Sequence, residues 1–164
     1  MIIRLTQRLA KKIKISPSLN HSIDVNAYAD WSAHLFTSER AQYIIVSNTT
    51  SLYSIVMHGG GITDSNKFIQ SILSFMSDFM QREGQEFLFR RLIVPESQEV
   101  IFSKSANRSV LGSMNDFIST AKFLLIEREL SPFEMSQIIN ETPMSILGYD
   151  SPKDAFAKMA LGKA

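Results

Sequence analysis

The chain has 164 residues, 45% of them hydrophobic and 20% charged, which indicates one globular domain over residues 1–164 and excludes a largely disordered chain. Its formal net charge of +1 excludes a strong overall attraction to nucleic acid, so any such preference has to be local. It contains no cysteine, which excludes disulfides, thiolate metal sites and thiol nucleophiles.

The first third of the chain predicts a strand, a helix and then an antiparallel sheet. Residues 1–5 form an apolar strand, and Thr6 is placed to cap a helix that runs through Ile13. A polar loop without periodicity follows at residues 16–26. Short polar connections then favour consecutive hairpins. We expect a three-stranded antiparallel meander, formed by residues 31–36, 41–47 and 52–57.

The rest of the chain is mainly helical. Residues 64–83 and 109–129 carry apolar side chains at three- and four-residue spacings, which is typical of helices that pack on a core. Ser131-Pro132 and Ser151-Pro152 each combine a cap with proline at the first helical position, and predict two shorter helices. The sequence therefore predicts an α+β fold in which these helices pack on the meander. Two further segments are an ambiguous strand or helix at 86–94 and a short strand at 100–103.

Basic residues suggest one candidate site. Five cations precede the first acidic residue, Asp24, and a basic helix of this kind can contact phosphates, although a solvated helix face has the same composition. Arg90 and Arg91 alternate with aromatic residues, a combination that serves nucleic-acid backbones and bases or, alternatively, forms a solvated surface. The candidate nucleic-acid-binding residues are Arg4, Arg8, Lys11, Lys12, Arg90, Arg91 and Arg108.

A second candidate site is a polar ligand pocket. The run from His58 to Gly61 joins a strand to a helix, where backbone amides can hold a phosphate. It lacks the P-loop lysine and the dinucleotide spacing, so a plain flexible turn is the alternative. The histidines lack the spacing of a helical metal site, and we expect no metal and no cofactor. The pocket candidates are His34, His58, Gly59, Gly60, Asn107, Arg108, Asn115 and Asp116.

The start of the helix at Asn107 is unusually rich in small and polar side chains. Such a face allows a phosphate, a base or another backbone to approach closely. The alternative is structural, because Asn107 or Ser109 can cap the helix while Gly112 permits tight helix packing.

Much of the chain resembles a known family. The segments MIIRLTQRLAKKIKI, ADWSAHLFTSERAQYIIVSNTTSLYSIVM, NRSVLGSMNDF and NETPMSILGYDSP resemble an uncharacterised family of small bacterial proteins that is known only as a domain of unknown function. The resemblance covers nearly the whole chain, and it implies no activity and no catalytic residues.

Residues 139–156, INETPMSILGYDSPKDAF, are also similar to the end of transposase and integrase catalytic domains. Such enzymes bind two metal ions through carboxylates from strands and helices. Across the predicted strands, the only carboxylate is Glu39, in a turn, which argues against an active nuclease. The resemblance implies scaffold positions at Asn140, Pro143, Leu147, Gly148, Tyr149 and Pro152.

We therefore expect a non-enzymatic binding module for nucleic acid or a partner protein, in a bacterial mobile-element, defence or toxin–antitoxin setting. The alternative is a small-ligand or nucleotide-binding enzyme that uses the polar pocket. Apolar runs are far shorter than the roughly 20 residues of a membrane helix, and the N-terminus lacks the order of a secretory signal. We expect a cytoplasmic protein without membrane contact, and the oligomeric state stays open.

Overall fold

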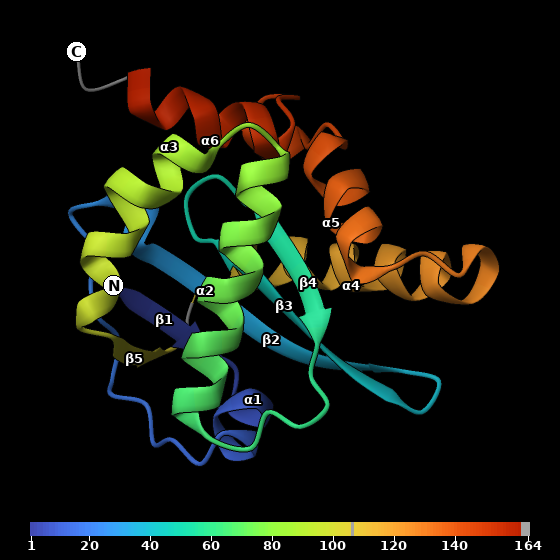
Figure 1. The fold of residues 1–164 in the computed structure, drawn as a ribbon, viewed down its shortest axis with the longest axis horizontal. Coiled ribbons are helices and arrows are strands. Elements are labelled where there is room, and N and C mark those ends of the chain that lie inside the picture. The colour runs from blue at the N-terminus through green and yellow to red at the C-terminus, as the bar shows by residue number, and fades with distance from the viewer. Residues whose placement is uncertain (106, 162–164) are drawn as a thin grey trace.

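The apolar run at the N-terminus forms a strand inside a five-stranded sheet, with order β4-β3-β2-β1-β5. The computed structural model describes residues 1–105 and 107–161, so positions 106 and 162–164 of the expected domain lie outside the described residues. Figure 1 shows the sheet with helices packed around it. The strands are β1 (Ile2–Leu5), β2 (Asp30–Ser38), β3 (Ala41–Asn48), β4 (Ser54–His58) and β5 (Ile101–Lys104).

The expected three-stranded meander is only part of this sheet. Strands β2, β3 and β4 pair antiparallel in succession, while β1 pairs parallel with both β2 and β5. The parallel pairs join segments far apart in the sequence, such as Ile2 and Ile101. The alternation of apolar and polar residues within a four-residue strand does not indicate which distant strand it pairs with. The sequence pattern therefore does not predict the mixed sheet.

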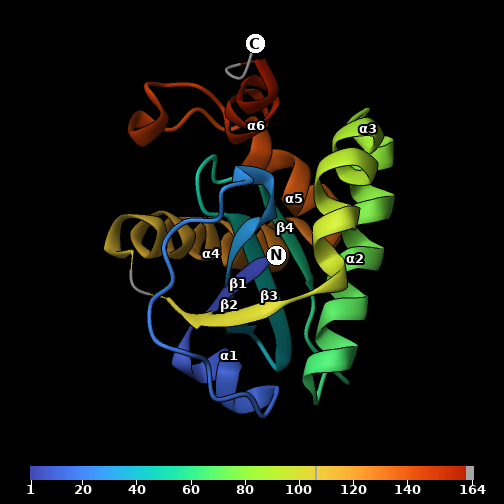
Figure 2. The same cartoon turned by 90° about the vertical axis from the view of Figure 1, so that its left-hand side faces the viewer.

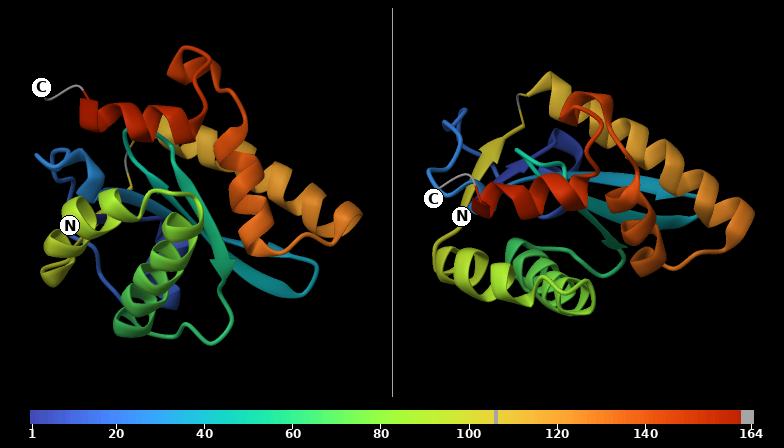
Figure 3. Two further views of the ribbon diagram at one scale, coloured as in Figure 1. Left: turned by 45° about the horizontal axis from the view of Figure 1, so that its top comes forward. Right: turned by 90° about the horizontal axis from the view of Figure 1, so that it is seen from above.

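Helices cover both faces of the sheet, as the right-hand view of Figure 3 shows. One core lies beneath α1 (Gln7–Lys12), α2 (Ser65–Arg82) and α6 (Pro152–Leu161). The other lies between the sheet and α4 (Arg108–Arg128) with α5 (Pro132–Glu141). The α+β class is therefore confirmed. No helix among the described residues is long and apolar enough to cross a membrane.

The ambiguous segment after Gly84 is helical. It forms α3 (Glu86–Leu88), a π-helical turn at Phe89–Ile93 and a 3₁₀ turn at Val94–Gln98. The side chains of Phe89 and Ile93 point into the core beneath α2. The four-residue spacing of these two side chains is typical of a helix. Because the apolar run is short, its pattern alone is equally compatible with a strand.

Polar side chains begin most of the helices as the sequence predicts. Asn107 accepts hydrogen bonds from the amides of Ser109 and Val110, and Ser131 forms a capping box with Glu134. Thr6 differs, because it occupies the N-cap of α1 but its hydroxyl makes no capping hydrogen bond. The Thr6 Oγ1 atom is buried without a partner among the described residues.

Side chains of α5 cover the free edge of β4. Asn140 Nδ2 donates to the Ser54 carbonyl, and its Oδ1 accepts from the Ser54 amide, both at 2.7 Å. One helical turn earlier, Ser136 Oγ accepts from the Val56 amide at 2.8 Å. Asn140 therefore acts as a substitute for one residue of a neighbouring strand, and it blunts an edge that would otherwise attract another chain.

A row of polar residues crosses one face of the sheet. Arg4 on β1 lies in register with Ser103 on β5 and Ser32 on β2. The row continues through Ser47 on β3 to Ser54 on β4, and every member is buried. Hydrogen bonds between hydroxyl groups satisfy some of these buried side chains, including the bond between Ser47 and Ser54 at 2.6 Å.

Candidate functional site at the carboxyl ends of the parallel strands

The adjacent parallel strands β1 and β5 send the chain to opposite faces of the sheet. After Leu5 the chain enters α1, which packs in the core beneath α2, and the segment after Lys104 leads to α4 on the other face. Figure 2 shows α1 below the ends of these strands. Because the chain leaves the two strands toward opposite faces, a crevice forms at their carboxyl ends. This is the place where open α/β sheets bind ligands.

A groove of about 830 Å³ lies at this position. The strand ends contribute Leu5, Thr6, Lys104 and Ser105, while α1 contributes Ala10 and Lys11. Its volume falls within the range of about 300–1,000 Å³ that is typical of small-ligand sites. The remaining lining residues are Gln7, Ile15, Ser16, Pro17 and Leu111.

The groove is lined by cations, hydroxyls and apolar side chains, without a carboxylate or an aromatic ring among its lining residues. Lys11 and Lys104 are exposed. Their charges favour an anionic ligand. The unpartnered hydroxyl of Thr6 supplies a hydrogen-bonding group that the protein itself leaves unused.

Further cations lie on α1, at Lys14 just after it and at the first residue of α4. Arg8 donates to Thr37 Oγ1 at 3.0 Å and Lys12 donates to Gln42 Oε1 at 2.6 Å, so both contact neutral groups. Within residues 1–105 and 107–161, none of the cations of this set forms an ion pair. We call the set the basic end; it comprises Arg8, Lys11, Lys12, Lys14, Lys104 and Arg108.

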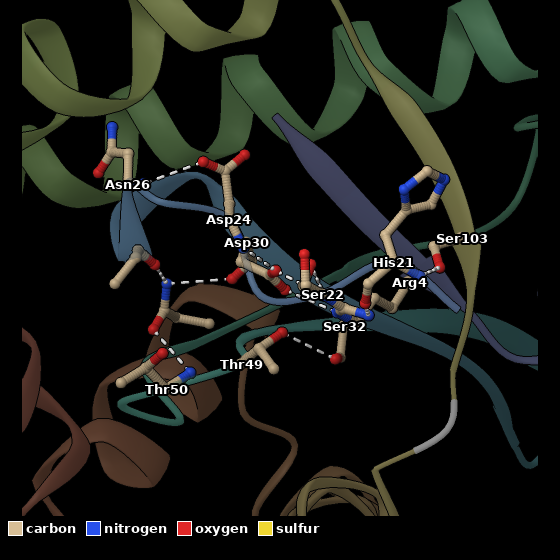
Figure 4. Close-up of polar contacts among 12 residues, drawn as sticks. Arg4, His21, Ser22, Asp24, Asn26, Asp30, Ser32, Thr49, Thr50 and Ser103 are labelled. Atoms are coloured by element: carbon tan, nitrogen blue, oxygen red, sulfur yellow. Dashed lines mark hydrogen bonds and ion pairs between the residues drawn. The ribbon is translucent and has the colours of Figure 1, made fainter. Parts of the chain in front are cut away.

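Arg4 lies inside the protein instead of on the basic end. Its Nε and Nη2 atoms donate to the two carboxylate oxygens of Asp30, each at 2.8 Å, and both residues are buried (Figure 4). Nη1 and Nη2 donate further hydrogen bonds to the carbonyls of His21 and Ser22. Because these contacts use four of the five guanidinium hydrogens and the residue is only 6% exposed, Arg4 is not available to a ligand.

The pKa of Asp30 reflects this pairing. Burial acts to raise it, but the hydrogen bonds from Arg4 and from the Asp24 amide outweigh burial and hold the pKa below its ordinary value. The loop at 16–26 is thereby tied to the buried ion pair at one end. At the other end, Ser18 pairs with β5 through the Phe102 carbonyl and the Lys104 amide. This loop supplies one wall of the groove.

The other predicted nucleic-acid-binding residues divide into two groups. Arg8, Lys11, Lys12 and Arg108 belong to the basic end. Arg90 and Arg91 follow α3, which lies at the opposite end of the molecule from α1 (Figure 1). Arg90 is paired with Glu86 at 2.6 Å.

The expected polar pocket is not assembled as one site. His34 on β2 lies beneath α4 with Asn115, whereas His58 ends β4 and its ring lies 5.1 Å from that of Tyr43, with β3 between the two histidines. Gly59 is a packing position, because a Cβ there would lie 3.3 Å from Gln42 and Ile44. Of the other pocket candidates, Gly60, Asn107, Arg108 and Asp116 are exposed.

Sequence reasoning missed Thr6, Lys104, Ser105 and Leu111 as members of one site. Their common feature is that they stand at the ends of two strands or beside the helix that follows. These residues lie where the chain leaves two neighbouring strands, β1 and β5, toward opposite faces of the sheet. Recognising that position requires the strand order, which the sequence alone does not give.

His34 gives the protein a pH-dependent stability. Burial lowers the pKa of His34 below its ordinary value, and the nearby cations Arg8 and Lys122 act in the same direction. Because the unfolded chain binds the proton more readily, the free energy of unfolding falls as the pH drops below the ordinary pKa of about 6.5. Urea denaturation of wild type and His34→Gln at pH 7.5 and 5.5 measures this change. The variant is expected to lose less stability on acidification, and equal losses would contradict the assignment.

A family model described as a domain of unknown function, DUF6933, matches residues 2–155. The match agrees with the resemblance to an uncharacterised family, and it supports neither a bacterial origin nor a relationship to transposases. A search of curated proteins finds no match. Asn140, which the transposase resemblance implied as a scaffold position, pairs with the main chain of β4.

Proposed function

We propose that this chain, which belongs to the DUF6933 family of domains of unknown function, is a non-enzymatic nucleic-acid-binding module. The observation that carries this proposal is the basic end, a group of cations without ion-pair partners among the described residues, two of which, Lys11 and Lys104, line a groove. The module contacts the phosphate backbone through this end of the molecule.

Charge is unevenly distributed although the net charge is only +1. The first 23 residues contain five cations and no acid, so the acidic side chains that balance them lie later in the chain. A local excess of this kind attracts a polyanion and orients it before contact. Phosphates, being present at every nucleotide, are the natural target of such a surface.

The composition of the groove favours contact with phosphates over contact with bases. Its lining contains two lysines and several hydroxyls or amides but no aromatic ring on which a base could stack. Phosphate contacts position a protein on nucleic acid without reading its sequence. We therefore expect binding with little sequence preference.

Removing charge from the basic end is expected to weaken binding. Fluorescence anisotropy with a labelled 20-nucleotide single strand, its duplex and its RNA counterpart tests this at 50 and 200 mM salt. The triple variant Arg8→Gln, Lys11→Gln, Lys12→Gln should bind at least about tenfold more weakly at 50 mM salt. The slope of log affinity against log salt should become shallower by about 0.7–0.9 for each phosphate that the variant no longer neutralises.

The matched control is Arg90→Gln, Arg91→Gln, which removes arginine charge from the opposite end of the molecule. This control should bind as wild type does. Equal losses in both variants would show nonspecific attraction to charge. No binding of any nucleic acid at 50 mM salt would contradict the proposal and direct attention to an acidic partner protein.

A further inference from the structure

The groove is lined by residues from several separate segments of the chain. One part of its lining comes from the ends of β1 and β5, a second part comes from α1 and Leu111 of α4, and Ile15 to Pro17 form a third wall. Pairing of Ser18 with Phe102 and Lys104 fixes this third wall to β5.

The charge inside the groove matches a dianion. Lys11 and Lys104 line it, and no carboxylate among the lining residues neutralises them. A phosphate within a nucleic-acid backbone is a diester with one negative charge, whereas a phosphate monoester carries about 1.5–2 charges at pH 7 and offers three strong acceptor oxygens. Two lysines and additional hydrogen-bond donors suit the monoester better.

Hydroxyl donors lie beside these lysines. Thr6 Oγ1 is buried at the end of β1 and has no partner among the described residues, although a threonine at an N-cap usually bonds its own helix. Ser105 lines the groove at the end of β5.

From this geometry we infer that the groove binds the terminal phosphate monoester of a nucleic-acid strand, while the outer cations hold the adjoining backbone. The volume of about 830 Å³ has room for a whole terminal nucleotide. This inference rests on the proposed function and specifies the part of the nucleic acid that the groove recognises.

Three versions of one 12-nucleotide DNA strand test the inference: one with a 5′-phosphate, one with a 3′-phosphate and one with hydroxyls at both ends. Anisotropy at 150 mM salt is expected to show about tenfold tighter binding for one phosphorylated end, because an added charged contact is worth about 1.4 kcal/mol or more. Equal affinities for the three strands would overturn the inference and leave the proposed function standing.

Variants locate the effect in the groove. Lys104→Gln, on an exposed position of an edge strand, should remove the preference for a phosphorylated end, so that the variant binds the three strands with equal affinity. Lys14→Gln, outside the groove lining, should weaken all three strands alike. A preference that survives in Lys104→Gln would overturn the assignment of the groove.

A nucleoside monophosphate separates this inference from the proposed function. Calorimetric titration of the wild-type protein with adenosine monophosphate, with adenosine as the control, measures the groove alone. Binding of the monophosphate without binding of any strand would support the groove as a phosphomonoester site and contradict nucleic-acid binding. Failure of the monophosphate and of all three strands would contradict both.

Discussion

Replacing Arg4 by methionine is expected to lower the free energy of unfolding by about 3–5 kcal/mol, because it leaves the buried carboxylate of Asp30 without its partner. Asp30 is fully buried, and Arg4 supplies two of the hydrogen bonds to it, each at 2.8 Å. The variant also frees the carbonyls of His21 and Ser22. Urea denaturation followed by circular dichroism at pH 7 measures the change.

The double variant Arg4→Met, Asp30→Leu is the matched control. Replacing both members of a buried ion pair by apolar side chains removes the unpaired charge, so the double variant should be considerably more stable than Arg4→Met alone. The pKa of folded Asp30 lies below its ordinary value, so the pair stabilises the protein above about pH 4 and loses this effect as the pH falls through the lower folded value. A decrease below about 1 kcal/mol in Arg4→Met at pH 7 would show that water reaches the pair.

The second large effect is expected at the edge of β4. Asn140→Leu keeps the approximate volume of the side chain but leaves the amide and the carbonyl of Ser54 buried without partners. Each unsatisfied group costs about 1–3 kcal/mol, so the free energy of unfolding should fall by about 2–6 kcal/mol for the two groups together. Chemical denaturation at neutral pH tests this value.

Two comparisons show whether the main-chain pairing is responsible. Ser136→Ala removes one partner, that of the Val56 amide, and should cost less than Asn140→Leu. Asn66→Leu places the same substitution on an exposed position of α2 and should change stability by no more than about 0.5 kcal/mol. If Asn140→Leu and Asn66→Leu lower the free energy of unfolding by the same amount, the pairing of Asn140 with β4 contributes little to stability.

Local patterns in the sequence predicted those parts of the fold that depend on neighbouring residues. The hairpins of β2, β3 and β4 follow from apolar runs with short polar connections. The caps at Asn107 and Ser131 follow from side chains that bond amides two or three residues ahead. These interactions are complete within a few residues, so the sequence alone contains them.

The site depends on relations that a single sequence does not display. Arg4 was grouped with the other N-terminal cations, yet its position on β1, opposite Ser32 and beside Asp30, takes it into the interior. Lys104 stands alone in the sequence, so no local pattern marks it, and only the pairing of β5 with β1 places it with Lys11 in the lining of the groove. Which charged residues lie together can be recognised only once the strand order is known.

The pairing of Ile2 with Ile101 also bears on the order in which the protein folds. Hairpins between β2, β3 and β4 close short loops, whereas β5 can join β1 only after nearly two thirds of the chain has been brought back to its beginning. Closure of a long loop costs more entropy and slows folding, and elements with few partners open first in the native state. Strand β5 has four residues and lies at an edge. We therefore expect the groove to come apart and re-form more readily than the antiparallel hairpins.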